Sequence, residues 1–156
     1  MPAQETLRVV TDLDEESAIR LWLAGIGIES PIKTDVGERT VYWADGPGMI
    51  LMSAKTSERA RAWMTETFDL PANLEIGFDL DFCRDRSSPQ TTIIKGTLEF
   101  LRQTGSDGGL WFDTSKTLVL MKRGSDLILN ESENLWTRSR MALVTQPYRR
   151  EALVAY

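Results

Sequence analysis

Residues 74–82, Leu-Glu-Ile-Gly-Phe-Asp-Leu-Asp-Phe, carry the clearest structural pattern of this chain. Apolar side chains at 74, 76, 78, 80 and 82 alternate with Glu75, Gly77, Asp79 and Asp81. Because residues two apart on a β-strand point to the same face, this stretch predicts a strand with one buried and one polar face. A sheet built around it must therefore be covered by helices on its apolar side.

Helical and strand patterns alternate on both sides of this strand. Apolar residues recur at helical spacing over three segments, which begin at Asp12 as N-cap, at Thr56 or Ser57, and at Ser88, and end at Gly25, Pro71 and Gly105. Strands are expected at residues 5–11, 39–44, 49–54, 110–112, 117–121 and 127–130. Short turns join most of them, which favours an α+β fold with a largely antiparallel mixed sheet and about three helices packed on one face. We expect a single domain over residues 1–156, because this length suits one core.

The five tryptophans fall into two groups. Trp22 and Trp63 lie on apolar helix faces, and Trp43 lies on the more apolar face of its strand, so all three are expected in the core. Trp111 follows a glycine pair and Trp136 follows a polar run. These two are candidate surface anchors for a partner, because interface hot spots are rich in tryptophan.

The residue types present exclude several classes of enzyme. The chain has no histidine and one cysteine, Cys83, so imidazole acid–base catalysis, histidine-ligated metals and an internal disulfide are excluded. The glycines at 25–27 and 105–109 follow predicted helices and precede strands, the reverse of the order in a phosphate-binding loop. We predict neither a cofactor nor a metal site.

Charge is distributed unevenly along the chain. The net charge is −5, and residues 1–82 hold 15 acidic and 7 basic side chains. An acidic body disfavours direct contact with nucleic acid and favours a basic macromolecular partner. Four C-terminal arginines, Arg138, Arg140, Arg149 and Arg150, offset this charge locally, and an anion site, an oligomer contact and a solvated face all remain open for them.

The chain shows no sign of membrane insertion or export. Its longest apolar run, residues 21–28, is far shorter than the roughly 20 residues that a transmembrane helix needs. The first residues lack the basic and apolar segments of a secretory signal. We therefore expect a cytoplasmic protein with no membrane contact.

Two acidic groups are candidate functional residues. Alternation places Glu75, Asp79 and Asp81 on one strand face, where they fit a solvated surface, an acidic protein-docking surface, or a magnesium-binding or acid–base site. A second group lies in the first turn of the predicted N-terminal helix, where negative charge suits the helix dipole; its members are Asp14, Glu15 and Glu16.

Three stretches in the second half of the chain carry a recognisable pattern. They read TFDLPANLEIGFDLDF at 67–82, LWFDTSKTLVLMKRGSDLILNESENLW at 110–136 and TRSRMALVTQPY at 137–148. Their order and residues resemble the Sit-type immunity proteins, a bacterial family that protects cells against swarming-inhibition toxins delivered by siblings. The resemblance extends over about residues 60–148 and includes no catalytic motif.

The resemblance implies a protein that neutralises a cognate toxin by stoichiometric binding and has no catalytic activity of its own. The acidic body favours a basic toxin. Nucleases are one class of basic toxin that would fit. The partner-binding candidates are Glu75, Asp79 and Asp81 first, Asp14, Glu15 and Glu16 second, and Trp111 and Trp136 as anchors. Two other functions stay open: an acidic module that inhibits another host or phage protein, and a metal-dependent enzyme that uses the same carboxylates. The sequence leaves the oligomeric state open.

Overall fold

The computed structural model describes residues 5–80, 85–113, 115–132 and 134–153. The strands are β1 (Glu5–Val10), β2 (Lys33–Asp35), β3 (Val41–Gly46), β4 (Met49–Lys55), β5 (Leu74–Leu80), β6 (Asp107–Phe112), β7 (Thr117–Arg123), β8 (Asp126–Asn130) and β9 (Arg149–Glu151). The helices are α1 (Glu15–Gly25), α2 (Glu58–Phe68), α3 (Ser87–Thr104) and α4 (Arg138–Met141). Within these ranges, no helix combines the length and the apolar character needed to cross a membrane.

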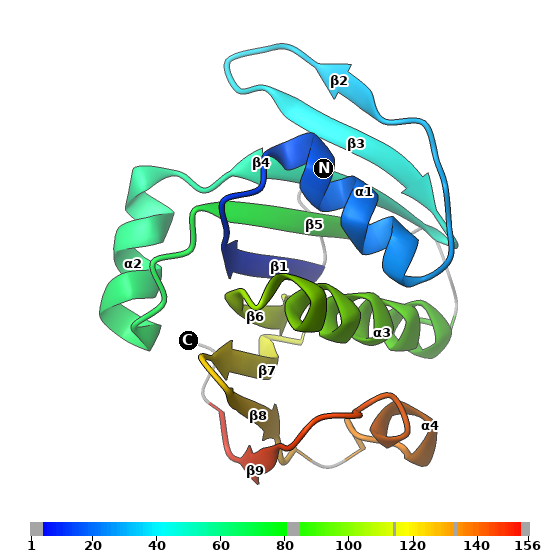
Figure 1. The fold of residues 1–156 in the computed structure, drawn as a ribbon, viewed down its shortest axis with the longest axis vertical. Helices are drawn as coiled ribbons and strands as arrows, with labels where there is room; N and C mark the ends of the chain where they lie inside the picture. Colours follow the sequence, from blue (N-terminus) through cyan, green and yellow to red (C-terminus); the bar gives the residue numbers. More distant parts are fainter. Residues whose placement is uncertain (1–4, 81–84, 114, 133, 154–156) are drawn as a thin grey trace.

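The described strands form one sheet in the order β2-β3-β4-β5-β1-β6-β7-β8-β9 (Figure 1). Neighbouring strands are antiparallel except β8 and β9, which are parallel. The predicted α+β class with a largely antiparallel mixed sheet is confirmed.

The main core lies between one face of this sheet and the helices α1 and α3, which cross that face side by side (Figure 1). Leu7 and Val9 of β1 are fully buried there, and the apolar residues of β5 from Leu74 to Leu80 are at most 4% exposed. The alternation predicted for β5 is therefore confirmed. Asp81 and Phe82, which complete the predicted strand, lie outside the described residues.

Helix α2 packs on the opposite face of the sheet, over β6 and β7. A second apolar cluster joins Met64 and Phe68 of α2 to Trp111 of β6 and Met121 of β7. The rings of Phe68 and Trp111 meet edge to face, with centroids 5.5 Å apart. The sequence predicts about three helices on one face, and α1, α3 and α4 share the main-core face. However, α2, one of the helices on which that prediction was based, covers part of the other face.

Strand β3 presents the opposite side to the core from the one predicted. Tyr42 packs against the main core, whereas Trp43 lies beside Met52 on the other face. The register of the β3–β4 hairpin explains why the predicted core position of Trp43 is wrong. The two residues at the turn, Pro47 and Gly48, set Ala44 opposite Leu51, which is fully buried in the main core.

Helix α1 begins later than the sequence predicts. Its N-cap is Asp14, not Asp12, and the Asp14 carboxylate accepts a hydrogen bond from the Ser17 N–H at 2.7 Å. Thr11 is held in place by Asn73, because the Thr11 N–H donates to Asn73 Oδ1 (2.9 Å) and Asn73 Nδ2 donates to the Thr11 carbonyl (2.7 Å). The helix therefore starts only beyond this clamp.

Gly96 is the point of close contact between α1 and α3. A Cβ atom on Gly96 would lie 2.3 Å from Cζ2 of Trp22, a fully buried residue of α1. The Trp22 ring also packs on Phe78 of β5, with centroids 4.9 Å apart. Because Gly96 has no side chain, the Trp22 ring can lie against α3 above the sheet. This contact accounts for a glycine in the middle of a helix, where it lowers helix stability by about 1 kcal/mol relative to alanine.

We predict that Gly96→Ala destabilises the protein by about 1–3 kcal/mol, because the added methyl group overlaps the Trp22 ring in a packed core. Urea unfolding measures this change. The control is Gly25→Ala, whose Cβ atom would meet only the partly exposed Glu99 side chain, and we expect it to shift stability by less than about 1 kcal/mol. Equal effects of the two substitutions would contradict the proposed role of the Trp22 contact.

A buried arginine fastens α4 to α3. Arg140 is 4% exposed and donates hydrogen bonds to the Ser87 carbonyl (3.1 Å), to Thr91 Oγ1 (2.9 Å) and to the Leu135 carbonyl (2.9 Å). Burial lowers the pKa of this guanidinium, and no described carboxylate pairs with it. Arg149, by contrast, forms ion pairs with carboxylates of β8 and β9. These two arginines therefore serve different structural roles and do not belong to one anion site.

We predict that Arg140→Ala lowers the free energy of unfolding by about 2–4 kcal/mol, because the carbonyls it satisfies would lose a charged donor in a buried site. Arg138→Ala, in the same short helix but exposed, is the matched control and is expected to change stability by less than about 0.5 kcal/mol. Chemical denaturation of both variants gives the comparison. An Arg140→Ala protein as stable as the control would refute the anchoring role.

Candidate partner-binding surface

One part of the sheet has no helix packed on it among the described residues. We call it the open face, and define it as the side of β3, β4 and β5 that points away from α1 and α3. None of its side chains belongs to either apolar cluster. Its members are Val41, Trp43, Asp45, Ile50, Met52, Ala54, Glu75, Gly77 and Asp79.

The strand register arranges the open face in rows. Asp45 lies opposite Ile50, which lies opposite Asp79, so one row carries two carboxylates on either side of an apolar residue. The next row holds Trp43, Met52 and Gly77, and the third includes Ala54 and Glu75. The open face therefore has an apolar middle with charged residues at both ends.

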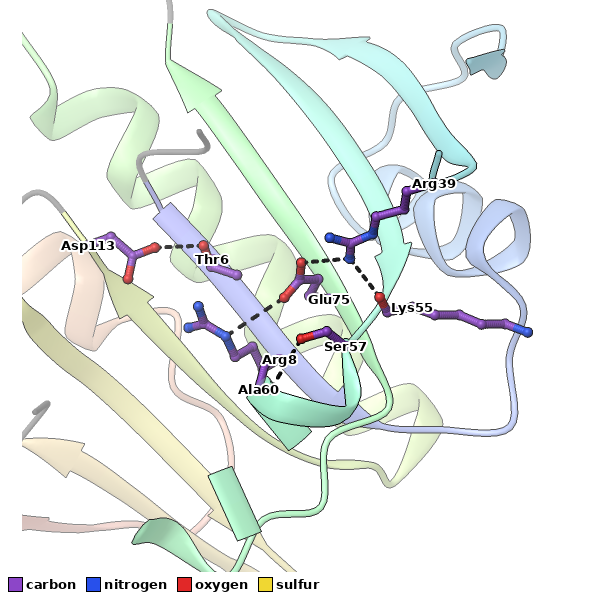
Figure 2. Close-up of polar contacts among 8 residues, drawn as sticks. All are labelled: Thr6, Arg8, Arg39, Lys55, Ser57, Ala60, Glu75 and Asp113. Carbon is purple, nitrogen blue, oxygen red and sulfur yellow. Dashed lines mark hydrogen bonds and ion pairs between the residues drawn. The ribbon is translucent and has the colours of Figure 1, made fainter. Parts of the chain in front are cut away.

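Glu75 is neutralised by two arginines. Arg39 Nη2 lies 3.0 Å from Glu75 Oε1 and also donates to the Lys55 carbonyl at 2.6 Å. From the other side, Arg8 Nε lies 3.9 Å from Glu75 Oε2 (Figure 2). The Arg8 guanidinium is 5.0 Å from the ring centroid of Trp111, so it also links this end of the face to the second apolar cluster.

Asp79 and Asp45 have a different environment from Glu75. Asp45 is exposed and Asp79 is half-buried, and neither has an ion pair with any described cation. The structure thus separates the predicted acidic group: Glu75 is engaged within the chain, Asp79 faces solvent beside Ile50, and Asp81 lies outside the described residues. The second carboxylate in this row without an ion pair to a described cation is Asp45, which was not among the residues predicted from the sequence. The turn at 47–48 could have indicated it, because a two-residue turn there places residue 45 opposite residue 50.

Trp43 is the largest side chain of the open face. It is half-buried, and Lys33 of the edge strand β2 lies opposite it, with Nζ 4.5 Å from the ring centroid. This is a cation–π contact. Together with Ile50 and Met52, which are also half-buried, Trp43 forms the apolar middle of the face.

The two tryptophans that the sequence offered as candidate surface anchors, Trp111 and Trp136, do not lie on the open face. Trp111 is fully buried in the second apolar cluster beneath α2, and Trp136 is 9% exposed in the main core. In this structure neither ring is presented on the surface. Trp111 is buried because β6 is an inner strand and Met64 and Phe68 of α2 pack against this ring.

The second acidic group lies at the start of α1, away from the open face. Asp14 caps the helix, and the Ser17 N–H bond lowers the pKa of its carboxyl group. Glu16 pairs with Arg20 one turn along the helix, at 3.1 Å. Asp14 and Glu15 line a groove at the strand ends together with Lys55 and other residues, so they belong to a different surface from Asp79.

The described residues contain no cluster of three or more histidine, cysteine, aspartate or glutamate side chains suited to a metal ion. Cys83 and Asp81 lie outside them. On the open face, the ion pairs of Glu75 occupy one carboxylate of the predicted group. What the open face offers chemically is an apolar patch with uncompensated negative charge at one end.

Comparison with known proteins gives one match. The model of the SitI3-like family matches residues 6–140 and so includes the first half of the chain, which the sequence resemblance covered less well. Neither curated proteins nor solved structures gave a match. The family match confirms the resemblance noted in the sequence, and the chain belongs to the SitI3-like family.

Proposed function

We propose that this protein is an immunity protein that binds a cognate toxin and neutralises it stoichiometrically, without catalysis of its own. The observation that carries the proposal is membership of the SitI3-like family over residues 6–140. The proposed partner is a toxin that enters or is made in the same cytoplasm, and the immunity protein would cover its active site or another essential surface.

The charge of the chain supports a basic toxin as the partner. The first half of the sequence is strongly acidic, and opposite charge on the two partners accelerates their association. Nucleases are the class of toxin we favour, because they need basic surfaces to bind nucleic acid. Asp79 remains among the proposed contact residues, whereas Glu75 would contribute mainly through its arginine partners.

The two alternative functions receive less support. A carboxylate-dependent metal enzyme would use Glu75, Asp79 and Asp81. Of these, Glu75 already accepts from Arg39 and lies beside Arg8, and Asp81 lies outside the described residues. An acidic module directed at another host or phage protein would use similar surfaces. Family membership favours the toxin over that partner.

We predict that the tagged full-length chain, expressed in its source cells, captures one stoichiometric partner whose production alone stops growth. Mass spectrometry identifies the partner, and co-expression with this chain in a sensitive host is expected to restore growth. The complex should have a one-to-one mass by light scattering, since neutralisation by binding consumes one inhibitor per toxin.

The matched control is co-expression of the captured protein with the Gly96→Ala variant, which we expect to protect in proportion to its remaining folded fraction. A captured partner that is harmless on its own would contradict the immunity function and favour the host-directed module. Restored growth through chemical turnover of the toxin, with no stable complex, would contradict neutralisation by binding.

A further inference from the structure

We propose that the open face is the docking surface for the toxin, and that the toxin segment seated there presents one lysine or arginine with apolar side chains beside it. This inference rests on the proposed function and specifies where and through which chemistry the partner binds. It departs from a purely acidic contact, because most of the surface concerned is apolar.

The apolar middle of the open face has the composition of an interface centre. Trp43, Ile50 and Met52 come from neighbouring strands, are half-buried, and lie outside both apolar clusters of the fold. Tryptophan and methionine are enriched at the centres of protein interfaces, where a few aromatic anchors carry much of the affinity. The sheet holds these side chains on regular hydrogen-bonded strands, so little ordering is required when a partner binds.

The charge of the face determines the kind of side chain that fits beside this patch. Asp45 and Asp79 lie on either side of Ile50, two strand spacings apart, or about 10 Å. A cation placed over Ile50 would therefore be about 5 Å from each carboxylate, close enough to be attracted by both. Neither carboxylate has an ion-pair partner among the described residues, so a lysine or arginine from the toxin would supply the missing charge.

A second copy of this chain fits the face poorly. The described cations that contact side chains of the open face are Lys33, Arg8 and Arg39, and each is already engaged: Lys33 with the Trp43 ring, and both arginines with Glu75. A face-to-face dimer would thus bring no free cation to Asp45 and Asp79. Charge complementarity favours a different protein.

The experiment measures binding of purified variants to the toxin identified by growth protection, using surface plasmon resonance at low and high salt. Ile50→Lys places an ammonium group between the two carboxylates, so we expect it to keep the melting temperature of the wild type and to lose toxin binding. Trp43→Ala is expected to weaken binding about tenfold or more, mainly through faster dissociation.

The charge contribution is tested by the double substitution Asp45→Asn with Asp79→Asn. We expect slower association at low salt and a weaker dependence of the association rate on salt. The matched control is Glu29→Gln with Glu131→Gln, two exposed acids outside the open face and outside both predicted acidic groups, and Tyr148→Ala is the control for an exposed aromatic side chain. We expect near wild-type binding from both controls.

The outcomes separate this inference from the proposed function. Full toxin binding by folded Ile50→Lys, or loss of binding in the Glu29→Gln with Glu131→Gln control alone, would overturn the open face as the docking surface and leave the immunity function standing. Failure of the wild-type chain to bind or to protect against any toxin would overturn both. A dimer of the free chain that Ile50→Lys dissociates, seen by analytical ultracentrifugation, would assign the face to a second copy and overturn the proposal.

Discussion

The fold depends on the strict two-residue alternation of β5 between its neighbours β4 and β1. Its apolar residues are buried beneath α1 and α3, and this burial is the main force that holds the helices on the sheet. The same alternation directs Glu75, Gly77 and Asp79 to the other side, because neighbouring residues of a strand cannot share a face. One periodic segment thus creates both the core and the open face.

Helix packing then decides how much of the second face stays available. Gly96 lets Trp22 lie between α3 and β5, so α1 and α3 cover the main-core face. Helix α2 covers the far side only over β6 and β7, where Met64 and Phe68 meet Trp111. On that side β3 and β4 carry the half-buried apolar side chains of Trp43, Ile50 and Met52 without a described helix above them, an arrangement that suits an interface with another protein.

Much of the fold could be predicted from sequence because its signals are local. Apolar residues that alternate located most strands, and apolar residues spaced three or four apart located most helices. The buried side of β5 was predicted correctly. Predictions that depended on long-range pairing were less successful. Trp43 was assigned to the core because β3 carries apolar or aromatic side chains on both faces, so its sequence does not show which face is buried. Only the register against β4 and β5 shows which side Trp43 occupies. Trp111 was a candidate surface anchor, because nothing in the sequence near residue 111 indicates that α2 packs over it.

The candidate surface was predicted only in part, for the same reason. Alternation grouped Glu75 with Asp79, but Arg8 and Arg39, which engage Glu75, are distant in sequence. The most direct test of the open face is carbodiimide labelling of carboxylates in the free chain and in its complex with the toxin, read by mass spectrometry. Our account predicts that Asp45 and Asp79 lose reactivity in the complex while Glu16 and Glu29 keep theirs. Protection of Glu16 and Glu29, with Asp45 and Asp79 still labelled, would contradict it.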